Sequence, residues 1–314
     1  VAAIHSDWQE IGLVVTGAIA LVIAALALLV PWRQQSNPIS EMGRAIRTGE
    51  IVPYYQPVVD IVSGRLLGAE VLMRWCKRDG SVVSPGSFIP LAESSGLIVE
   101  MTRSIMYRVI EEAGSVIGRR PRMQIAFNLA ASHFSDDRIV EDMRLIFARA
   151  PIRLSQVVVE VTERQPLDNL TAARRVIAAL QGLGVKVAID DVGAGHSGLS
   201  YMLKLGVDII KIDKLFIDAL GDDRNSTTIV GTLAELANSM RMDIVAEGVE
   251  TFEQVRALRE HGIRAAQGYV FAPPLPASSF LQLVEALDPR PDAAEAVPAR
   301  VARRRSALAV MPAG

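Results

Sequence analysis

The sequence has few of the residues that mark several common classes of protein. Cys76 is the only cysteine among 314 residues, which excludes an internal disulfide and any zinc site built from several cysteines. The 33 basic and 35 acidic residues give a net charge of -2, so the basic excess of proteins that bind DNA or RNA duplexes is missing. The glycines that follow Asp191 lack the Gly-Lys-Ser/Thr ending of a phosphate-binding loop. These absences favour a small ligand held by metal ions over a nucleic-acid duplex.

One long apolar segment stands near the start of the chain. Residues 11–30 carry no charge, and a helix of this length, at about 1.5 Å per residue, matches a hydrocarbon core of about 30 Å. We therefore predict a transmembrane helix over 11–30. Arg33, Arg44 and Arg47 follow the segment and no Lys or Arg precedes it, so the positive-inside rule predicts a single-pass protein of the inner membrane with its remaining chain in the cytoplasm.

Differences in amino-acid composition divide the rest of the chain into four segments. We expect an extracytoplasmic stub over 1–10, a linker over 31–40 rich in Gln, Ser, Asn and Pro, one large domain over 41–287, and a disordered tail over 288–314 rich in Ala, Pro and Arg. The chain begins with Val1 rather than Met, so we expect it to be the C-terminal part of a longer protein with a sensing region upstream.

Short β-branched segments alternate with longer amphipathic ones across 41–287. The amphipathic segments at 98–117, 136–149, 169–182, 226–240 and 251–261 predict helices. Eight strand–helix units in about 240 residues favour a closed TIM-type (β/α)₈ barrel over an open sheet. The predicted strands are 51–61, 65–75, 122–130, 156–163, 185–191, 208–213, 242–248 and 263–269.

Polar residues interrupt the apolar strands near their ends. In a barrel, the C-terminal ends of the strands meet at one mouth, so we expect these side chains to share a pocket. Carboxylates that converge there repel one another unless a cation neutralises them, and carboxylate and amide oxygens suit Mg²⁺ or Mn²⁺ better than zinc. The residues are Glu70, Asn128, Glu160, Asp190, Asp191, Lys211, Glu247 and Gln267.

Simpler interpretations of single residues stay open at this point. Glu70 could pair with Arg74 on the same strand, and Lys211 could form a surface ion pair with Asp213. Asp190 and Asp191 are harder to explain in this way. Two adjacent acids after a buried strand are costly unless a cation or a hydrogen-bond donor meets them.

The ordered motifs of residues 39–285 resemble the EAL-domain family of bacterial c-di-GMP phosphodiesterases. The motifs are YYQPVV, AEVLMRW, FNLA, VEVTE, DDVGAGHS, KID, AEGVE and QGYVFAPPLP. The signature triplet reads Glu70-Val71-Leu72 here, with a changed middle residue that we expect to matter little. The resemblance implies hydrolysis of c-di-GMP to linear pGpG with two bound Mg²⁺ or Mn²⁺ ions.

The resemblance also implies a role for each matching residue. Lys211 would polarise the attacking water, Glu247 would accept a proton or support the second metal, and Gln267 would help to position that site. Glu163 would steady the loop after Asp191. The first metal would be held by Glu70, Asn128, Glu160 and Asp190, the second by Asp190 and Asp191, and the substrate by Gln56, Leu72 and Arg74.

The loop after Asp191 departs from the family pattern at Val192, Ala194, His196 and Gly198. In the family this loop couples metal binding to formation of a homodimer through the barrel. The departures therefore concern both this coupling and the rate of c-di-GMP hydrolysis. The partners implied are c-di-GMP, a membrane and a second copy of the chain, but no DNA or RNA duplex. The alternative function is a catalytically weak or inactive EAL domain that acts as a c-di-GMP receptor, although receptors of this kind lack ligands that are all present here.

Overall fold

The computed structural model describes residues 15–25, 37–162, 167, 169–192, 204–220 and 224–288, and the structural statements below concern these residues. The chain divides into two compact units, Val1–Arg44 and Ala45–Gly314, which are described separately. In the first unit, residues 15–25 are helical. The helix α2 (Pro38–Arg47) extends across the boundary between the units.

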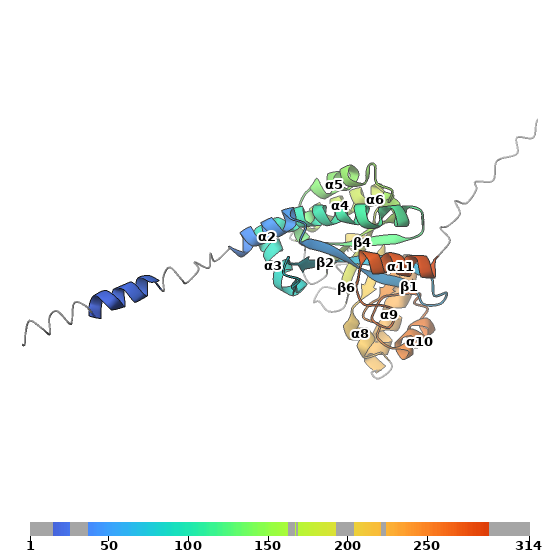
Figure 1. Cartoon of the computed structure of the whole chain (residues 1–314). Helices are drawn as coiled ribbons and strands as arrows, with labels where there is room; N and C mark the ends of the chain where they lie inside the picture. Colours follow the sequence, from blue (N-terminus) through green and yellow to red (C-terminus); the bar gives the residue numbers. More distant parts are fainter. Residues whose placement is uncertain are drawn as a thin grey trace, which may run out of the picture. The chain divides into compact units, whose positions relative to one another are not determined.

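A ten-stranded sheet that closes on itself forms the centre of the second unit (Figure 1). Its order is β10-β1-β9-β8-β7-β6-β5-β4-β2-β3, and β1 also pairs with β2. Because β1 pairs with β2 on one side and with β9 on the other, eight of the strands make a closed barrel. The strands are β1 (Ile51–Asp60), β2 (Leu66–Cys76), β3 (Val82–Val83), β4 (Gln124–Leu129), β5 (Val157–Thr162), β6 (Lys186–Val192), β7 (Ile209–Ile212), β8 (Asp243–Ala246), β9 (Ala265–Ala266) and β10 (Leu275–Pro276).

The predicted α/β barrel is present, with one departure from a regular (β/α)₈ pattern. β1 runs antiparallel to both β2 and β9, whereas the other barrel strands run parallel to one another. The pairing of β1 with β2 runs from Ile51 with Trp75 to Val59 with Leu66. The connection after Asp60 is too short for the dozen or so residues that a parallel crossover needs, so the two strands form a hairpin.

Helices cover the outside of the barrel (Figure 1). α4, α5 and α6 lie side by side on one part of the barrel, and α8, α9 and α10 lie together on another. The 3-10 turns η1 (Ala131–Phe134) and η2 (Leu154–Gln156) precede α5 and β5. The helices of this unit are α3 (Pro85–Ser95), α4 (Leu97–Gly118), α5 (Arg138–Phe147), α6 (Leu170–Gly182), α8 (Lys214–Asp218), α9 (Arg224–Met240), α10 (Phe252–Glu260) and α11 (Ala277–Leu287).

Side-chain caps set the starts of two helices. The Asn169 side chain accepts hydrogen bonds from the backbone N–H groups of Thr171 and Ala172, at 3.1 and 3.0 Å, and α6 begins at the next residue. At α10, Thr251 and Gln254 bond to each other's backbone N–H groups. Each such cap contributes about 1 kcal/mol, so these polar residues define where the apolar helical pattern begins.

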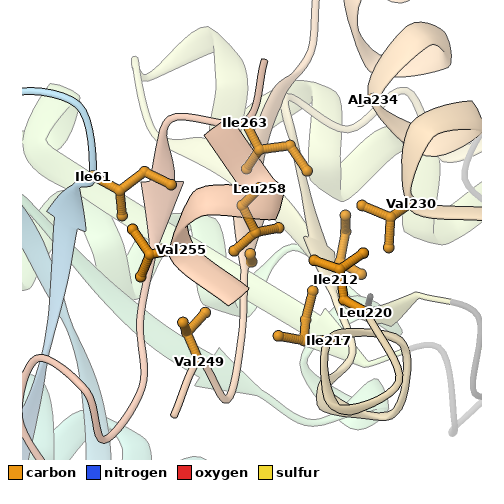
Figure 2. Packing of buried hydrophobic residues seen from close by; sticks show 12 residues of the cluster. Ile61, Ile212, Ile217, Leu220, Val230, Ala234, Val249, Val255, Leu258 and Ile263 are labelled. Atoms are coloured by element: carbon orange, nitrogen blue, oxygen red, sulfur yellow. The ribbon is translucent and has the colours of Figure 1, made fainter. Parts of the chain in front are cut away.

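The core between the barrel and its outer helices is aliphatic. Figure 2 shows Ile212 of β7, Ile217 of α8 and Leu258 of α10 directed into one cluster, and each of the three is fully buried. Val230 of α9 also points into this cluster. Burying such a side chain contributes about 1.5 to 3 kcal/mol. The cluster therefore fixes α8, α9 and α10 against the strands that carry the polar residues of the predicted site.

The predicted transmembrane helix over 11–30 is wrong as judged by the residues that the structure describes. Within these residues no helix is both long and apolar enough to cross a membrane. Residues 11–14 and 26–30 lie outside the described part. The single-pass inner-membrane localisation, which depended on this helix, is withdrawn with it.

The other predicted segment boundaries stay predictions. The stub of 1–10, most of the linker of 31–40 and residues 289–314 of the tail lie outside the described residues. The described strands and helices of the second unit lie between Ile51 and Leu287, within the barrel domain predicted over 41–287.

His133 makes the stability of the domain sensitive to acid. Its side chain is buried, its Nδ1 lies 3.2 Å from the carbonyl of Ala130, and its Nε2 has no partner among the described residues. Burial lowers the pKa of the imidazole below its ordinary value of 6.5. The unfolded chain therefore takes up this proton at a higher pH than the folded chain, and stability falls as the pH drops below about 6.5.

We expect His133→Phe to reduce the loss of unfolding free energy between about pH 7 and about pH 5, because it removes a linkage worth about 1.4 kcal/mol for each pH unit between the two pKa values. Urea unfolding at the two pH values measures this difference. Equal losses in the wild-type chain and the variant would contradict the assignment.

Candidate functional site

The barrel brings the predicted polar residues to the C-terminal ends of its strands. Glu70 lies in β2, Glu160 in β5, Asp190 in β6 and Lys211 in β7. Glu247 directly follows β8, and Gln267 and Asn128 lie after β9 and near the end of β4. Side chains separated by up to 197 positions in the sequence thus come within hydrogen-bonding distance of one another.

Lys211 lies at the centre of this group. Its Nζ is 2.6 Å from Glu160 Oε2, 2.6 Å from Glu247 Oε1, 3.1 Å from Glu70 Oε2 and 3.3 Å from Asp190 Oδ1. The Lys211 side chain is only 3% exposed. One ammonium group therefore faces four carboxyl groups away from solvent, and it cannot neutralise all four when they are ionised.

Two amide side chains complete the surroundings of Glu70. Asn128 Nδ2 donates to Glu70 Oε1 at 2.6 Å, and Gln267 Nε2 donates to Glu70 Oε2 at 2.7 Å and to Glu247 Oε1 at 3.0 Å. The alternative of a simple surface pair between Lys211 and Asp213 is excluded, because Lys211 is buried among other acids and Asp213 accepts from the backbone N–H of Leu215 at the start of α8.

A bulge in β6 directs two adjacent acids toward the same site. Pairing with β7 shifts between Ile189 and Val192, and Asp191 has a left-handed backbone with a φ of 58°. In a regular strand, successive side chains point to opposite faces. The bulge breaks this alternation, so Asp190 and Asp191 both reach the site, and the unusual backbone there costs about 1 to 3 kcal/mol. The Asp191 carboxylate accepts a hydrogen bond from Thr162 Oγ1 at 3.3 Å.

Burial and charge act in opposite directions on the pKa values of the site. Burial and neighbouring carboxyl groups raise the pKa of Glu160 well above its ordinary range, and burial and the charges of Asp190 and Glu70 do the same for Glu247. Burial also disfavours the charged form of Glu70, but Lys211 and the amide hydrogen bonds outweigh it and lower that pKa. Burial would lower the pKa of Lys211, whereas the four carboxyl groups raise it well above its ordinary value.

The donor set fits divalent cations. One group of carboxyl oxygens comes from Glu70, Glu160 and Asp190, and a second comes from Asp190, Asp191 and Glu247. Within each group, one oxygen from each residue lies within 4.8 Å of the others. Hard oxygen donors of this kind suit Mg²⁺, Mn²⁺ or Ca²⁺, and the shared Asp190 places the two groups next to each other.

The three residues predicted to contact substrate lie on the first two strands. Gln56 of β1 is opposite Glu70 of β2, and Leu72 and Arg74 lie two and four residues beyond Glu70, on the same face of β2. The Arg74 guanidinium is 5.6 Å from the ring centre of Tyr54. Arg74 is thus oriented by a cation–π contact with Tyr54 and by a 3.0 Å hydrogen bond from its Nη1 to the carbonyl of Met73, and not by a pair with Glu70, which excludes the other simple alternative.

Gly268 allows the chain to turn sharply next to Gln267. Its φ is 155°, and a Cβ built on it would lie 2.1 Å from the carbonyl oxygen of Val249. Only glycine fits this close approach, since the atoms in conflict belong to backbone. The position of the Gln267 amide therefore depends on the residue that follows it.

Two contributors to the site carry no clear signal in the sequence. Thr162 contacts Asp191 and Tyr54 contacts Arg74, yet in the sequence both look like ordinary strand residues. The sequence could have indicated them only by position, because Thr162 lies two residues after Glu160 and Tyr54 lies two residues before Gln56. The predicted role of Glu163 and the loop departures at 194, 196 and 198 fall outside the described residues.

Comparison with known proteins gives a consistent result. A family model described as EAL domain matches residues 39–274. The chain is 39% identical over 279 residues to the Escherichia coli (strain K12) protein named "Probable cyclic di-GMP phosphodiesterase PdeG", covering 87% of this chain and 54% of that protein. It is 36% identical over 278 residues to "Probable cyclic di-GMP phosphodiesterase PdeB" of the same strain, covering 88% of this chain and 52% of that protein.

Solved structures show the same likeness. The structure described as "PaMucR Phosphodiesterase, c-di-GMP complex" is 32% identical, with a TM-score of 0.71, and the match covers 77% of this chain and 99% of that chain. An EAL domain protein from Listeria monocytogenes EGD-e is 29% identical, with a TM-score of 0.70, and covers 79% of this chain and 97% of its own. The chain spans about half the length of the two E. coli relatives above.

Proposed function

Because this chain belongs to the EAL domain family, we propose that it is a metal-dependent phosphodiesterase that hydrolyses c-di-GMP to linear pGpG. The observation that carries the proposal is that two groups of carboxyl ligands lie at the mouth of the barrel and share Asp190. A domain that only bound a nucleotide would have no need for four buried or half-buried acids around one lysine.

The ligand assignment follows the two groups of acids. Glu70, Glu160 and Asp190, together with Asn128, would hold one divalent cation, and Asp190 and Asp191 would hold a second. We favour Mg²⁺ or Mn²⁺. When bound, such ions polarise the phosphodiester and make a water molecule more nucleophilic.

The remaining residues have roles that the chain supplies itself. Lys211 donates hydrogen bonds from the centre of the site and orients the attacking water and the carboxyl groups around it. Glu247, whose Oε1 lies 2.6 Å from Lys211 Nζ and which belongs to the second group of carboxyl oxygens, would accept a proton or support the second metal. Gln267 fixes Glu247 and Glu70 relative to each other through its two hydrogen bonds.

Substrate recognition is assigned to β1 and β2. The planar guanidinium of Arg74 suits a phosphate group, and Tyr54 limits its freedom before substrate arrives. Gln56 and Leu72 lie on the same side of the hairpin as Arg74 and would contact the rest of the nucleotide. The homodimer through the barrel and the role of Glu163 stay predictions.

The direct test is incubation of the purified chain with c-di-GMP and either Mg²⁺ or Mn²⁺, followed by chromatography for pGpG. We expect pGpG to accumulate only when a divalent ion is present. Tight binding of c-di-GMP without any pGpG would contradict the enzyme assignment and identify the chain as a receptor instead.

Calcium is expected to replace magnesium poorly. Ca²⁺ takes six to eight oxygens at about 2.3 to 2.6 Å, whereas Mg²⁺ requires six at about 2.0 to 2.1 Å, so calcium relaxes the geometry that in-line attack needs. The rate of pGpG release with each ion, at equal concentration, measures the effect. Calcium-supported turnover equal to that with magnesium would argue against the site as assigned.

A further inference from the structure

The interior of the barrel contains a chamber of about 470 Å³ directly behind the carboxylate site. The interior of a TIM-type barrel is normally filled by layers of bulky branched side chains. Here the layer below the site combines the larger Val158, Ile209 and Val245 with three small residues, Ala126, Ala188 and Ala265. The three alanines leave space in the barrel interior that larger side chains would fill.

The chamber has one end at the site and the other at solvent. Glu160, Lys211 and Gln267 line its inner end. Its outer end is lined by the first residues of strands, among them Lys186 of β6 and Asp243 of β8. These two side chains form an ion pair at 2.8 Å and are 38% and 67% exposed, so this end opens at the N-terminal face of the barrel.

The charged residues that line the chamber indicate that water, and not an apolar molecule, occupies this space. Glu160 and Lys211 lie at its inner end. Both ends of the chamber carry charged side chains, including the ion pair of Arg264 with Asp60 at 2.8 Å. Water enters cavities that are roomy and offer several polar partners, whereas purely apolar cavities stay dry.

We propose that the chamber is a water-filled passage that connects the back of the carboxylate site with solvent at the N-terminal face of the barrel, and that it delivers the water consumed in each turnover. Hydration of the passage stands on geometry alone, whereas the delivery role rests on the proposed phosphodiesterase function. On the proposed function, a substrate held by Arg74 would lie over the C-terminal face of the site, and the passage would reach the site from the opposite face.

The balance of the reaction defines what the passage must carry. Each hydrolysis adds the oxygen of one water to phosphorus and breaks the bond from phosphorus to the 3′ oxygen of the sugar. One proton of that water ends on the 3′ oxygen, and the other leaves to solvent. One water must therefore enter for every turnover while the nucleotide lies over the mouth.

Hydration can be tested on the full chain without metal or substrate. With ¹³C-labelled alanine methyl groups, we expect cross-relaxation with water at Ala126 and Ala188, which line the chamber, and none at Ala113, which is fully buried in α4. No water signal at Ala126 and Ala188 would overturn the proposal. A xenon-induced shift of those two methyl groups would show a dry cavity and would overturn it as well.

Delivery can be tested by narrowing the passage. We expect Ala188→Leu to abolish the water signal at Ala126 and to lower kcat several-fold with KM unchanged, since the substrate face is untouched. Ala178→Leu, the same change at an exposed position of α6, should alter neither. Ala126→Val makes a smaller addition to the same layer and replaces Ala188→Leu if that variant does not fold.

The outcomes separate the two proposals. A folded Ala188→Leu variant that loses the water signal yet keeps the wild-type kcat would overturn delivery. A wild-type chain that forms no pGpG would overturn the proposed function, and delivery with it. The methyl signals of the wild-type chain would still decide whether the passage is hydrated.

Discussion

Asp190→Asn is expected to abolish hydrolysis of c-di-GMP while the barrel stays folded. Asp190 is the one residue that belongs to both groups of carboxyl ligands, so its loss weakens both ion sites together. Removing a partner that only supports a metal ligand commonly costs about 10- to 100-fold, and we expect removal of a shared ligand to cost more than about 100-fold in kcat. The rate of pGpG formation at saturating Mg²⁺ measures the effect.

The fold should survive this change because the substitution removes one of several mutually repelling acids and preserves the size of the side chain. Asp137→Asn provides the matched control, since Asp137 is 62% exposed and pairs with Arg175, which is 64% exposed. The control should keep the wild-type rate. A folded Asp190→Asn variant with that same rate would show that the acids of the site are structural.

Lys211→Met is expected to destabilise the metal-free chain by about 3 kcal/mol or more and to abolish turnover. The substitution keeps the length of the side chain but removes the ammonium group that, among the described residues, faces the four carboxyl groups. Breaking a buried ion pair by removing one partner typically costs about 3 to 5 kcal/mol. Urea unfolding in the presence of a chelator measures the loss.

Divalent ions should recover part of this stability, because they neutralise the same carboxyl groups that Lys211 did. We therefore expect Mn²⁺ to raise the Tm of Lys211→Met more than that of the wild-type chain. Lys214→Met is the control, since Lys214 is 44% exposed and its two surface ion pairs, with Asp218 and Glu250, contribute less than about 1 kcal/mol each. Equal losses in the two variants would contradict the central role of Lys211.

The strands and the polar residues of the site were predictable because each leaves a local signal. Glu160 stands out because it interrupts a run of valines, and Asp190 stands out because it directly follows an apolar segment. A rule of barrel architecture then places such residues at one mouth, even though Glu70 and Gln267 are far apart in sequence. The contacts from Lys211 to four acids follow from this convergence.

Features that depend on pairing between strands were not predictable. The hairpin direction of β1 depends on its partners, and the bulge at Asp191 depends on its register with β7. The chamber likewise depends on which small residues share a layer. The prediction of a span over 11–30 had a different basis, because hydropathy measures only composition, and among the described residues no helix is both long and apolar enough to cross a membrane.

The antiparallel first strand also bears on the order in which the molecule folds. Barrel closure joins Val59 to Ala266 and Asp60 to Ala265, residues from opposite ends of the domain, through only two paired positions. Pairing of β1 with β10 also joins opposite ends of the domain, whereas the strand pairs from β2 to β8 join segments closer in sequence, and the entropy lost on closing a loop grows with the length of that loop. We expect the strand layers from β2 to β8 to assemble first and the seam between β1 and β9 to close last. The same seam is then where hydrogen exchange should first detect opening of the native barrel.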